Sequence, residues 1–192
     1  DLDGLRGEKL QERPVKGRPT YSDFFALINE VTGEEDVNVI ANTDIYFDET
    51  LAFLEQMEFP DRAFVLSRRQ VLADGNTQLV DHAHSQDAWI FQGPVRDIQG
   101  DFYLGRPMCD TRIAYEIRRA GYQVSNPAFS IRAFHLHLSG KRSYTPADEI
   151  PPPYLPVPLG NLLPLWKHLA MACFRGERPV PYRWDLHLRV QR

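Results

Sequence analysis

The sequence has few cysteines and no long apolar run. Its 192 residues include two cysteines, Cys109 and Cys173, which are too few for a disulfide framework and lack the paired spacing of a zinc site. A reducing compartment is the simpler expectation. No segment approaches the roughly 20 consecutive apolar residues of a membrane-spanning helix. We therefore expect a globular, cytoplasmic protein of one domain, or of one domain with an extension.

The chain also lacks an excess of positive charge. Its net charge of −4 gives no support for a nucleic-acid-binding protein, which usually has a basic face. The charge is uneven, because residues 1–140 carry a net −8 and residues 141–192 a net +4. A basic tail on an acidic body indicates that the tail meets an anionic partner or the body itself.

The most informative stretch is 36–49, DVNVIANTDIYFDE. Its apolar residues at 37 and 39–41 predict a strand covered on both faces, because a short β-branched run between charged residues is typical of a buried sheet. Asn42 and Asp44 follow at the carboxyl end of this strand, the edge where open α/β sheets bind ligands. A carboxylate beside an amide suits a hard cation. The alternative is that both residues only form an Asx-type turn.

The flanking pattern predicts alternating helices and strands. A helix is predicted from Tyr21, with Ser22 as its N-cap and Gly33 as its stop. A second helix, with acidic residues in its first turn, is predicted over 48–57. Strands are expected at 63–66 and 88–91. Residues 1–20 are a polar arm without a core of their own. The expected organisation is an N-terminal arm (1–20), an α/β domain (21–145) and a Pro-rich strap with a C-terminal helix and tail (146–192).

Three polar side chains precede the strand at 88–91. His82 and His84 would share one face of an extended segment, and with Asp87 they are residue types that bind metals. A polar run without a secondary-structure pattern favours a solvated loop instead. Asp87 lies where the strand begins.

A helix is predicted from residue 111 to Gly121, with Asp110 as its N-cap or first-turn residue. Capping alone would explain an aspartate there. The functional alternative is a general base that faces a pocket and positions an acceptor hydroxyl.

Residues 129–137 alternate as a strand that ends in two histidines. With a period of two, His135 and His137 point to the same side. Lys141 and Arg142 follow in a flexible loop of the kind that closes over phosphate oxygens. These features together indicate a metal–diphosphate site, and the alternative is a strand end followed by a solvated charge pair.

Proline is concentrated late in the chain, where nine of the 15 prolines lie from Pro146 onward. This predicts an extended spacer or a strap across the body. The helix expected over 161–174 is too apolar for free exposure. We expect it to dock on the body, with contact through 161–192 to a second copy or to the inner face of a membrane as the alternatives.

Five short motifs resemble a group of bacterial GT-A-type glycosyltransferase-like proteins. They are RPTY (18–21), IANTDI (40–45), SQDAWIF (85–91), GRPMCD (105–110) and FHLH (134–137), and the match covers about 18–145. The resemblance implies a nucleotide-sugar-binding α/β fold with a GT-A-like mixed sheet flanked by helices. It also implies that Asn42-Thr43-Asp44 is a degenerate DxD element.

The resemblance further implies roles for single residues. Asp44 would bind Mn²⁺ or Mg²⁺, and His137, or alternatively His135, would complete the metal site. Asp110 is similar to the acidic residue near the acceptor, and Asp87 is the second catalytic candidate. The candidates for the nucleotide-sugar side are Asn42, Asp44, Arg106, Lys141 and Arg142.

The sequence departs from the family pattern in two places. Asn42 replaces the first acidic residue of the usual DxD, and no strand–helix–strand unit for the nucleoside precedes residue 21. Either the sequence starts inside a longer protein or the protein is a shortened relative. The expected function is metal-dependent glycosyl transfer to a glycan or other hydroxyl acceptor. A non-catalytic binding domain and a metal-dependent phosphoester hydrolase are the alternatives.

Overall fold

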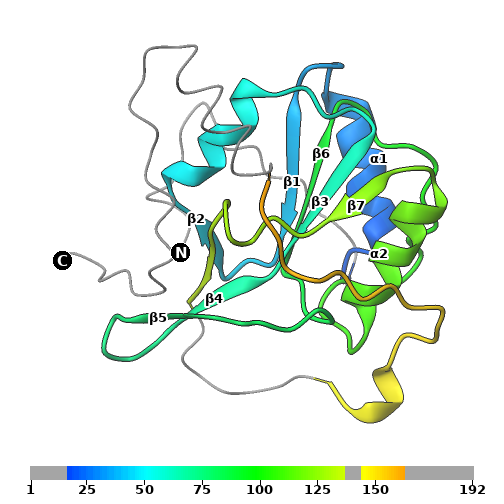
Figure 1. The fold of residues 1–192 in the computed structure, drawn as a ribbon. Helices are drawn as coiled ribbons and strands as arrows, with labels where there is room; N and C mark the ends of the chain where they lie inside the picture. Colours follow the sequence, from blue (N-terminus) through cyan, green and yellow to red (C-terminus); the bar gives the residue numbers. More distant parts are fainter. Residues whose placement is uncertain (1–16, 137–143, 163–192) are drawn as a thin grey trace, which may run out of the picture.

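The computed structural model describes residues 17–136 and 144–162, and two four-stranded mixed sheets form the framework of this part of the chain (Figure 1). The first sheet has the order β1 (Val37–Ala41), β6 (Ala88–Gln92), β3 (Arg62–Leu66), β7 (Gln123–Ser125). The second has the order β2 (Ile45–Phe47), β8 (Ala133–His135), β4 (Arg68–Val71), β5 (Thr77–Leu79). The predicted α/β class is confirmed.

The chain passes from the first sheet to the second three times, from β1 to β2, from β3 to β4 and from β7 to β8. The first two of these crossings lie at the same end of the first sheet. β1 leads into β2 across residues 42–44, and β3 leads into β4 across Ser67. β6 runs antiparallel to both β1 and β3, with Ala88 opposite Ala41 on one side and opposite Leu66 on the other. The carboxyl ends of β1 and β3 therefore meet the start of β6 where both crossings occur.

Two hydrophobic cores lie on opposite faces of the first sheet. On one face, helices α1 (Tyr21–Val31) and α2 (Cys109–Arg119) pack with Trp89 and Phe91 of β6. On the other face, Ile90 packs with residues of β8 and of the 3₁₀ helix η2 (Glu49–Gln56). The alternation along β6 separates these two sets, because successive strand residues point to opposite faces. Figure 1 shows α1 and α2 on one side of the sheet and η2 on the other.

β1 differs from the expectation of a strand covered on both faces. It is an edge strand that pairs only with β6 in the described part of the chain, and its burial alternates. Val37 and Val39 are each 37% exposed, whereas Ile40 is buried. The prediction was wrong because an apolar side chain tolerates an exposed position on an edge strand, so composition alone does not report the number of covered faces.

The helix starts also differ in detail. The N-cap of α1 is Thr20 and not Ser22: its hydroxyl accepts from the Asp23 N–H, and the Asp23 carboxylate accepts from the Thr20 N–H in a capping box. The helix expected over 48–57 is the 3₁₀ helix η2, capped by Asp48. α2 begins at Cys109 after Met108 in the left-handed region, so Asp110 is a first-turn residue and not the cap.

The strand expected over 129–137 is shorter than predicted. The N–H groups of Ser130 and Ile131 both donate to the Pro127 carbonyl, which makes a turn, and β8 follows at Ala133–His135. The predicted position of His137 lies outside the described residues.

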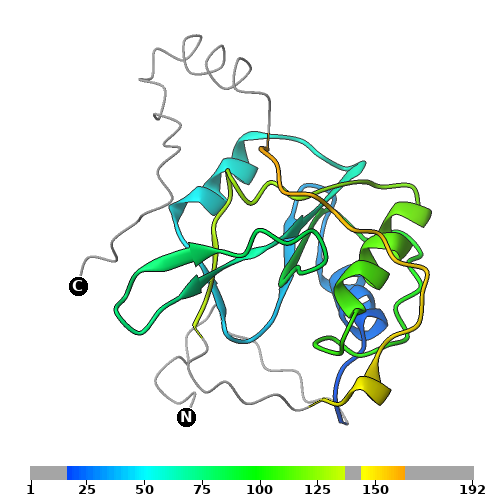
Figure 2. The same ribbon diagram turned by 60° about the horizontal axis from the view of Figure 1, so that its bottom comes forward.

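The Pro-rich segment forms a strap across the body. After a short 3₁₀ turn, η3 (Pro146–Asp148), it is extended, and the N–H groups of Ile150, Leu155 and Val157 donate to carbonyls of Pro107, Thr111 and Ala83. Figure 2 shows the strap running alongside α2. The helix expected over 161–174 lies almost wholly outside the described residues. Within the described part, no helix is long and apolar enough to cross a membrane.

The capping box gives a matched test of the fold. Thr20→Ala removes the hydroxyl that satisfies the Asp23 N–H, and we expect it to lower the free energy of unfolding by about 1 kcal/mol. Ser22→Ala also removes a hydroxyl, two residues later, where we expect an effect within about 0.5 kcal/mol. Urea unfolding followed by circular dichroism measures both. Equal losses in the two variants would contradict the assignment of the cap.

Candidate functional site

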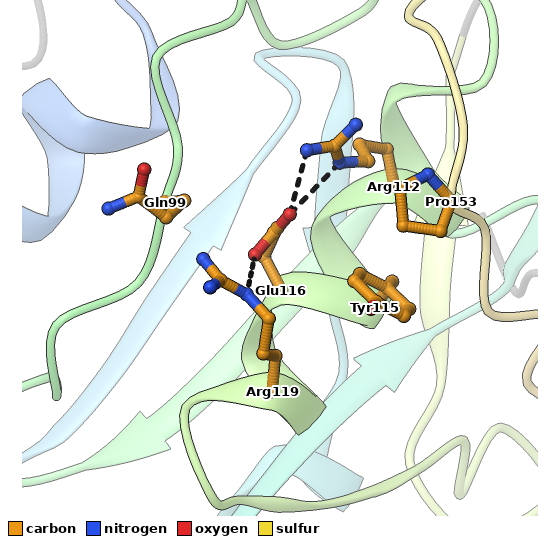
Figure 3. Close-up of a pocket in the computed structure, with 6 residues that line it drawn as sticks. All are labelled: Gln99, Arg112, Tyr115, Glu116, Arg119 and Pro153. Carbon is orange, nitrogen blue, oxygen red and sulfur yellow. Dashed lines mark hydrogen bonds and ion pairs between the residues drawn. The ribbon is translucent and has the colours of Figure 1, made fainter.

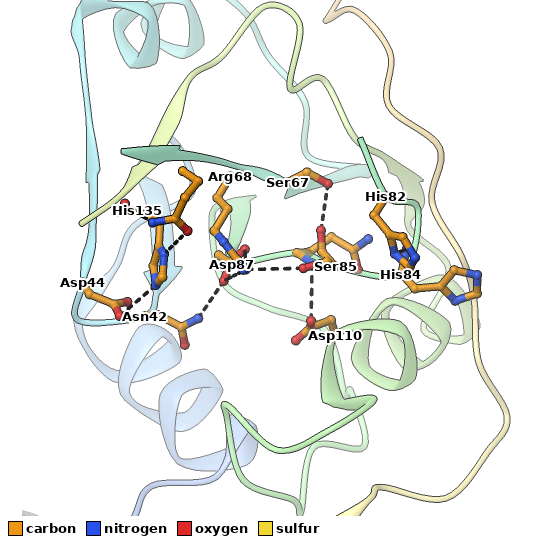
Figure 4. A network of polar contacts seen from close by, with 12 residues as sticks. Asn42, Asp44, Ser67, Arg68, His82, His84, Ser85, Asp87, Asp110 and His135 are labelled. Atoms are coloured by element: carbon orange, nitrogen blue, oxygen red, sulfur yellow. Dashed lines mark hydrogen bonds and ion pairs between the residues drawn. The ribbon is translucent and has the colours of Figure 1, made fainter. Parts of the chain in front are cut away.

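Asp87 forms hydrogen bonds to both the β1–β2 and the β3–β4 segments. Its N–H donates to the Leu66 carbonyl at the end of β3, and its carbonyl accepts from the Asn42 N–H after β1. Its carboxylate accepts from Asn42 Nδ2 at 3.1 Å and from Arg68 Nη1 at 3.0 and 2.9 Å. Asp87 is 5% exposed, so this ion pair is shielded from water on the aspartate side. The network is drawn in Figure 4.

Asp44 and His135 form a separate contact nearby (Figure 4). The Oδ2 of Asp44 lies 2.9 Å from Nε2 of His135, and the Leu136 N–H donates to the Asp44 carbonyl. The other ring nitrogen, Nδ1, lies 2.8 Å from Oε1 of Gln70. The Gln70 amide nitrogen donates to the carbonyls of Val71 and His135, which fixes the orientation of the amide.

The orientation of the Gln70 amide indicates which nitrogen of the His135 ring carries a hydrogen. Because Oε1 of Gln70 is only an acceptor, Nδ1 of His135 carries a hydrogen and donates to it. A neutral ring would then direct the Nε2 lone pair at the Asp44 carboxylate, with two acceptors facing each other at 2.9 Å. With a second ring hydrogen on Nε2, the contact is instead a hydrogen bond between an imidazolium and a carboxylate. The geometry is therefore that of a His–Asp ion pair.

Asp110 lies at the start of α2 on the other side of Asp87. Its Oδ2 accepts from the Gln86 N–H at 3.4 Å, and its Oδ1 accepts from the Cys109 thiol at 3.0 Å. Burial, followed by the nearby negative charge of Asp87, raises the pKa of Asp110 to about 7. Arg68 and the two hydrogen bonds oppose this rise. A carboxyl group that titrates near neutral pH is suited to accept a proton.

The remaining sequence candidates lie in different surroundings. Arg106 pairs with Asp148 of η3 at 2.6 Å, which directs it toward the strap. His82 and His84 lie in a turn with their ring centroids 5.3 Å apart, and both are exposed. His137, Lys141 and Arg142 lie outside the described residues. Within the described residues, no group of three or more His, Cys, Asp or Glu side chains could hold a metal ion.

Sequence reasoning missed two residues of the site, Arg68 and Gln70. Both lie on β4, and with a period of two they share one face of that strand. The adjacent Ser67-Arg68-Arg69 triplet follows a buried strand, which was a usable signal for a site at the end of that strand. Nothing in the local sequence of Gln70 identifies its partner, because His135 is 65 residues away.

A separate shallow depression lies on the outer side of α2. It has a volume of about 310 Å³ and is lined by Gln99, Arg112, Tyr115, Glu116, Arg119 and Pro153 (Figure 3). Glu116 is buried and already paired, to Arg112 at 2.7 Å and to Arg119 at 2.6 Å. None of the candidate site residues lines it.

The raised pKa of Asp110 makes a prediction about stability. Because the folded protein holds the proton more tightly than the unfolded chain, Asp110 contributes stability at pH values below its ordinary pKa of 3.8, and this contribution is lost as pH rises through about 7. Asp110→Asn has no proton to lose. We therefore expect wild-type stability to fall relative to that of Asp110→Asn between about pH 4 and pH 7.

Urea unfolding of both proteins at several pH values measures this difference. Asp97→Asn, which changes an exposed carboxylate in the loop after β6, is the matched control and should follow the wild type. Parallel curves for wild type and Asp110→Asn would show that the pKa of Asp110 is not raised.

Comparison with known proteins gives no further assignment: no protein-family model matches the sequence, and no curated protein or solved structure matches it significantly.

Proposed function

We propose that the protein is a metal-dependent glycosyltransferase that moves a sugar from a nucleotide-sugar donor to a hydroxyl acceptor. The observation that carries this proposal is the convergence of the five motifs. Asp44, Asp87, Asp110 and His135 come from four of them and lie near one another (Figure 4). Asp44 contacts His135, while Asp110 accepts from the N–H of Gln86, the residue before Asp87. Tyr21 belongs to the remaining motif, RPTY, and its hydroxyl contacts the sulfur of Cys109, the residue before Asp110. Residues that only cap helices or fill a core need not converge in this way.

The Asp44–His135 pair fits a divalent cation. Carboxylate oxygen is a ligand that suits Mn²⁺, and imidazole nitrogen is a common ligand of other divalent transition metals. Two neighbouring ligand atoms of an octahedral ion stand about 3 Å apart, since each bond is about 2.1 Å long. The separation of Oδ2 and Nε2 is 2.9 Å. Gln70 supports the pair as outer partners of ligating histidines do, by accepting the hydrogen of the second ring nitrogen.

In the proposal, Asp44 and His135 would hold the ion, and His137 would complete the set of protein ligands. Lys141 and Arg142 would add positive charge beside the donor diphosphate. A bound ion supplies positive charge to the diphosphate leaving group.

Asp110 serves in the proposal as the base for the acceptor hydroxyl. Its pKa of about 7 matches an acceptor of protons near neutral pH, and direct attack by that hydroxyl gives inversion at the sugar carbon. Asp87 is engaged by Arg68 and Asn42, so its role in the proposal is to position the site and to raise the pKa of Asp110. Arg106, paired with Asp148, is assigned no contact with the donor.

Calorimetric titration tests the donor side. Uridine, guanosine and cytidine diphosphates are titrated with and without Mn²⁺, and we expect one of them to bind only with the metal. Asp44→Ala should weaken this binding at least 100-fold, because it removes the carboxylate ligand. Asp97→Ala removes an exposed carboxylate and should bind as the wild type does.

The outcomes separate the classes of function. Wild-type affinity in Asp44→Ala would refute the metal site. No metal-dependent binding of any of the three nucleotides would favour a non-catalytic binding domain. Nucleotide binding in Asp110→Asn without transfer would support the assignment of Asp110 to the acceptor side.

Gln70 gives a second test of the metal site. Gln70→Leu keeps a similar volume but removes the acceptor for Nδ1 of His135, so the ring loses its fixed orientation. We expect the affinity for Mn²⁺ to fall by about 10- to 100-fold. Gln70→Glu restores an acceptor and should retain most of the affinity. Equal affinities in Gln70→Leu and wild type would exclude His135 as a ligand oriented by Gln70.

A further inference from the structure

A chain of three polar side chains runs from the helical core to the candidate base. The Tyr21 hydroxyl of α1 donates to the Cys109 sulfur at 3.6 Å, and the Cys109 thiol donates to Oδ1 of Asp110 at 3.0 Å. Tyr21 and Cys109 are both fully buried among apolar side chains. Tyr21 also packs edge-on against Trp89, with ring centroids 5.1 Å apart. When Asp110 is ionised, the hydrogen bonds run from Tyr21 through Cys109 to the carboxylate, because a carboxylate can only accept.

Burial keeps both donors in their protonated forms. Desolvation, with the neighbouring negative charge of Asp110, raises the pKa of the Cys109 thiol, and desolvation raises that of the Tyr21 hydroxyl. A thiol in such surroundings is inert as a nucleophile. Cys109 therefore acts as a donor to Asp110, and Tyr21 polarises that donor.

The two carboxyl oxygens of Asp110 have different hydrogen-bond partners. Oδ1 is held by the thiol at 3.0 Å, whereas Oδ2 has a longer contact of 3.4 Å with the Gln86 N–H. Asp110 as a whole residue is half-buried. We propose that Cys109 and Tyr21 are positioning residues that hold Oδ1 and leave Oδ2 to take the proton of the acceptor hydroxyl. This inference rests on the proposed function.

The groups around Asp110 determine whether loss of the Cys109 thiol raises or lowers the pKa of Asp110. Asp87 raises the pKa of Asp110, whereas Arg68, the Cys109 thiol and the Gln86 N–H lower it. Tyr21, on α1, acts through the sulfur. Removing the thiol takes away a hydrogen bond to the charged carboxylate and leaves the other groups in place. The carboxyl group should then hold its proton more tightly.

The experiment measures the proton affinity of Asp110 directly. Carbon-13 NMR of carboxyl-labelled aspartate is recorded from about pH 5 to about pH 9, with the Asp110 signal assigned by its loss in Asp110→Asn. We expect Cys109→Ala to raise the proton affinity roughly three- to tenfold, as befits a weak S–H donor to a charged group. Cys109→Ser keeps a donor and should not raise it. Tyr21→Phe should raise it by a smaller factor.

The matched control is Thr111, the residue after Asp110 in α2. Thr111 is fully buried, and its hydroxyl donates to the Met108 carbonyl, not to Asp110. Thr111→Ala should lower stability without changing the titration of Asp110. If Cys109→Ala and Cys109→Ser raise the proton affinity equally, or if neither changes it, the proposed hydrogen-bond role is overturned.

Activity then separates this inference from the proposed function. If transfer is observed, the acid limb of the kcat/KM profile should move to higher pH in Cys109→Ala by the factor that NMR measures, and Cys109→Ser should restore the wild-type profile. An unmoved limb would overturn the positioning role. If no nucleotide sugar is turned over, the proposed function fails, while the NMR titration still decides whether Cys109 sets the proton affinity of Asp110.

Discussion

The arrangement of the site depends on the hydrogen bonds of Asp87. Its backbone closes the ends of β1 and β3 against the start of β6, and its carboxylate binds side chains from the β1–β2 and the β3–β4 segments. A buried carboxylate is costly to leave unpaired, so Asp87 favours conformations in which Asn42 and Arg68 remain bound to it. Asp87 lies between the Asp44–His135 pair and Asp110 (Figure 4).

Much of the framework could be predicted from local pattern. The helix predicted from residue 111 to Gly121 corresponds to α2, and its apolar residues Ile113, Ala114 and Ile117 lie fully buried on one face. The short apolar runs correctly placed β1, β3 and β6. Local pattern failed where long-range pairing decided the outcome. It did not show that β1 is an edge strand, or that a turn at Pro127 shortens β8.

Part of the candidate site could also be predicted from the sequence, namely the residues that have a local sequence signal. Asp44 and Asp110 were found because each lies at the end of a recognisable element, where ligands commonly bind. Arg68 and Gln70 were missed because their importance comes from residues far away in the sequence. The role of Asp110 was undecided between cap and base. The left-handed Met108 resolves the first part, since α2 begins without a side-chain cap.

The Pro-rich strap connects the last described residues mechanically to the site. Ile150 and Leu155 donate to carbonyls on either side of Asp110, those of Pro107 and Thr111. Further hydrogen bonds tie the strap to the body through the N–H groups of Val157, Gly160 and Leu162, which donate to Ala83, Asn126 and Ser130. The strap therefore links the first turn of α2 to the turn at Ala83 and to the segment between β7 and β8, three parts of the chain that are far apart in sequence.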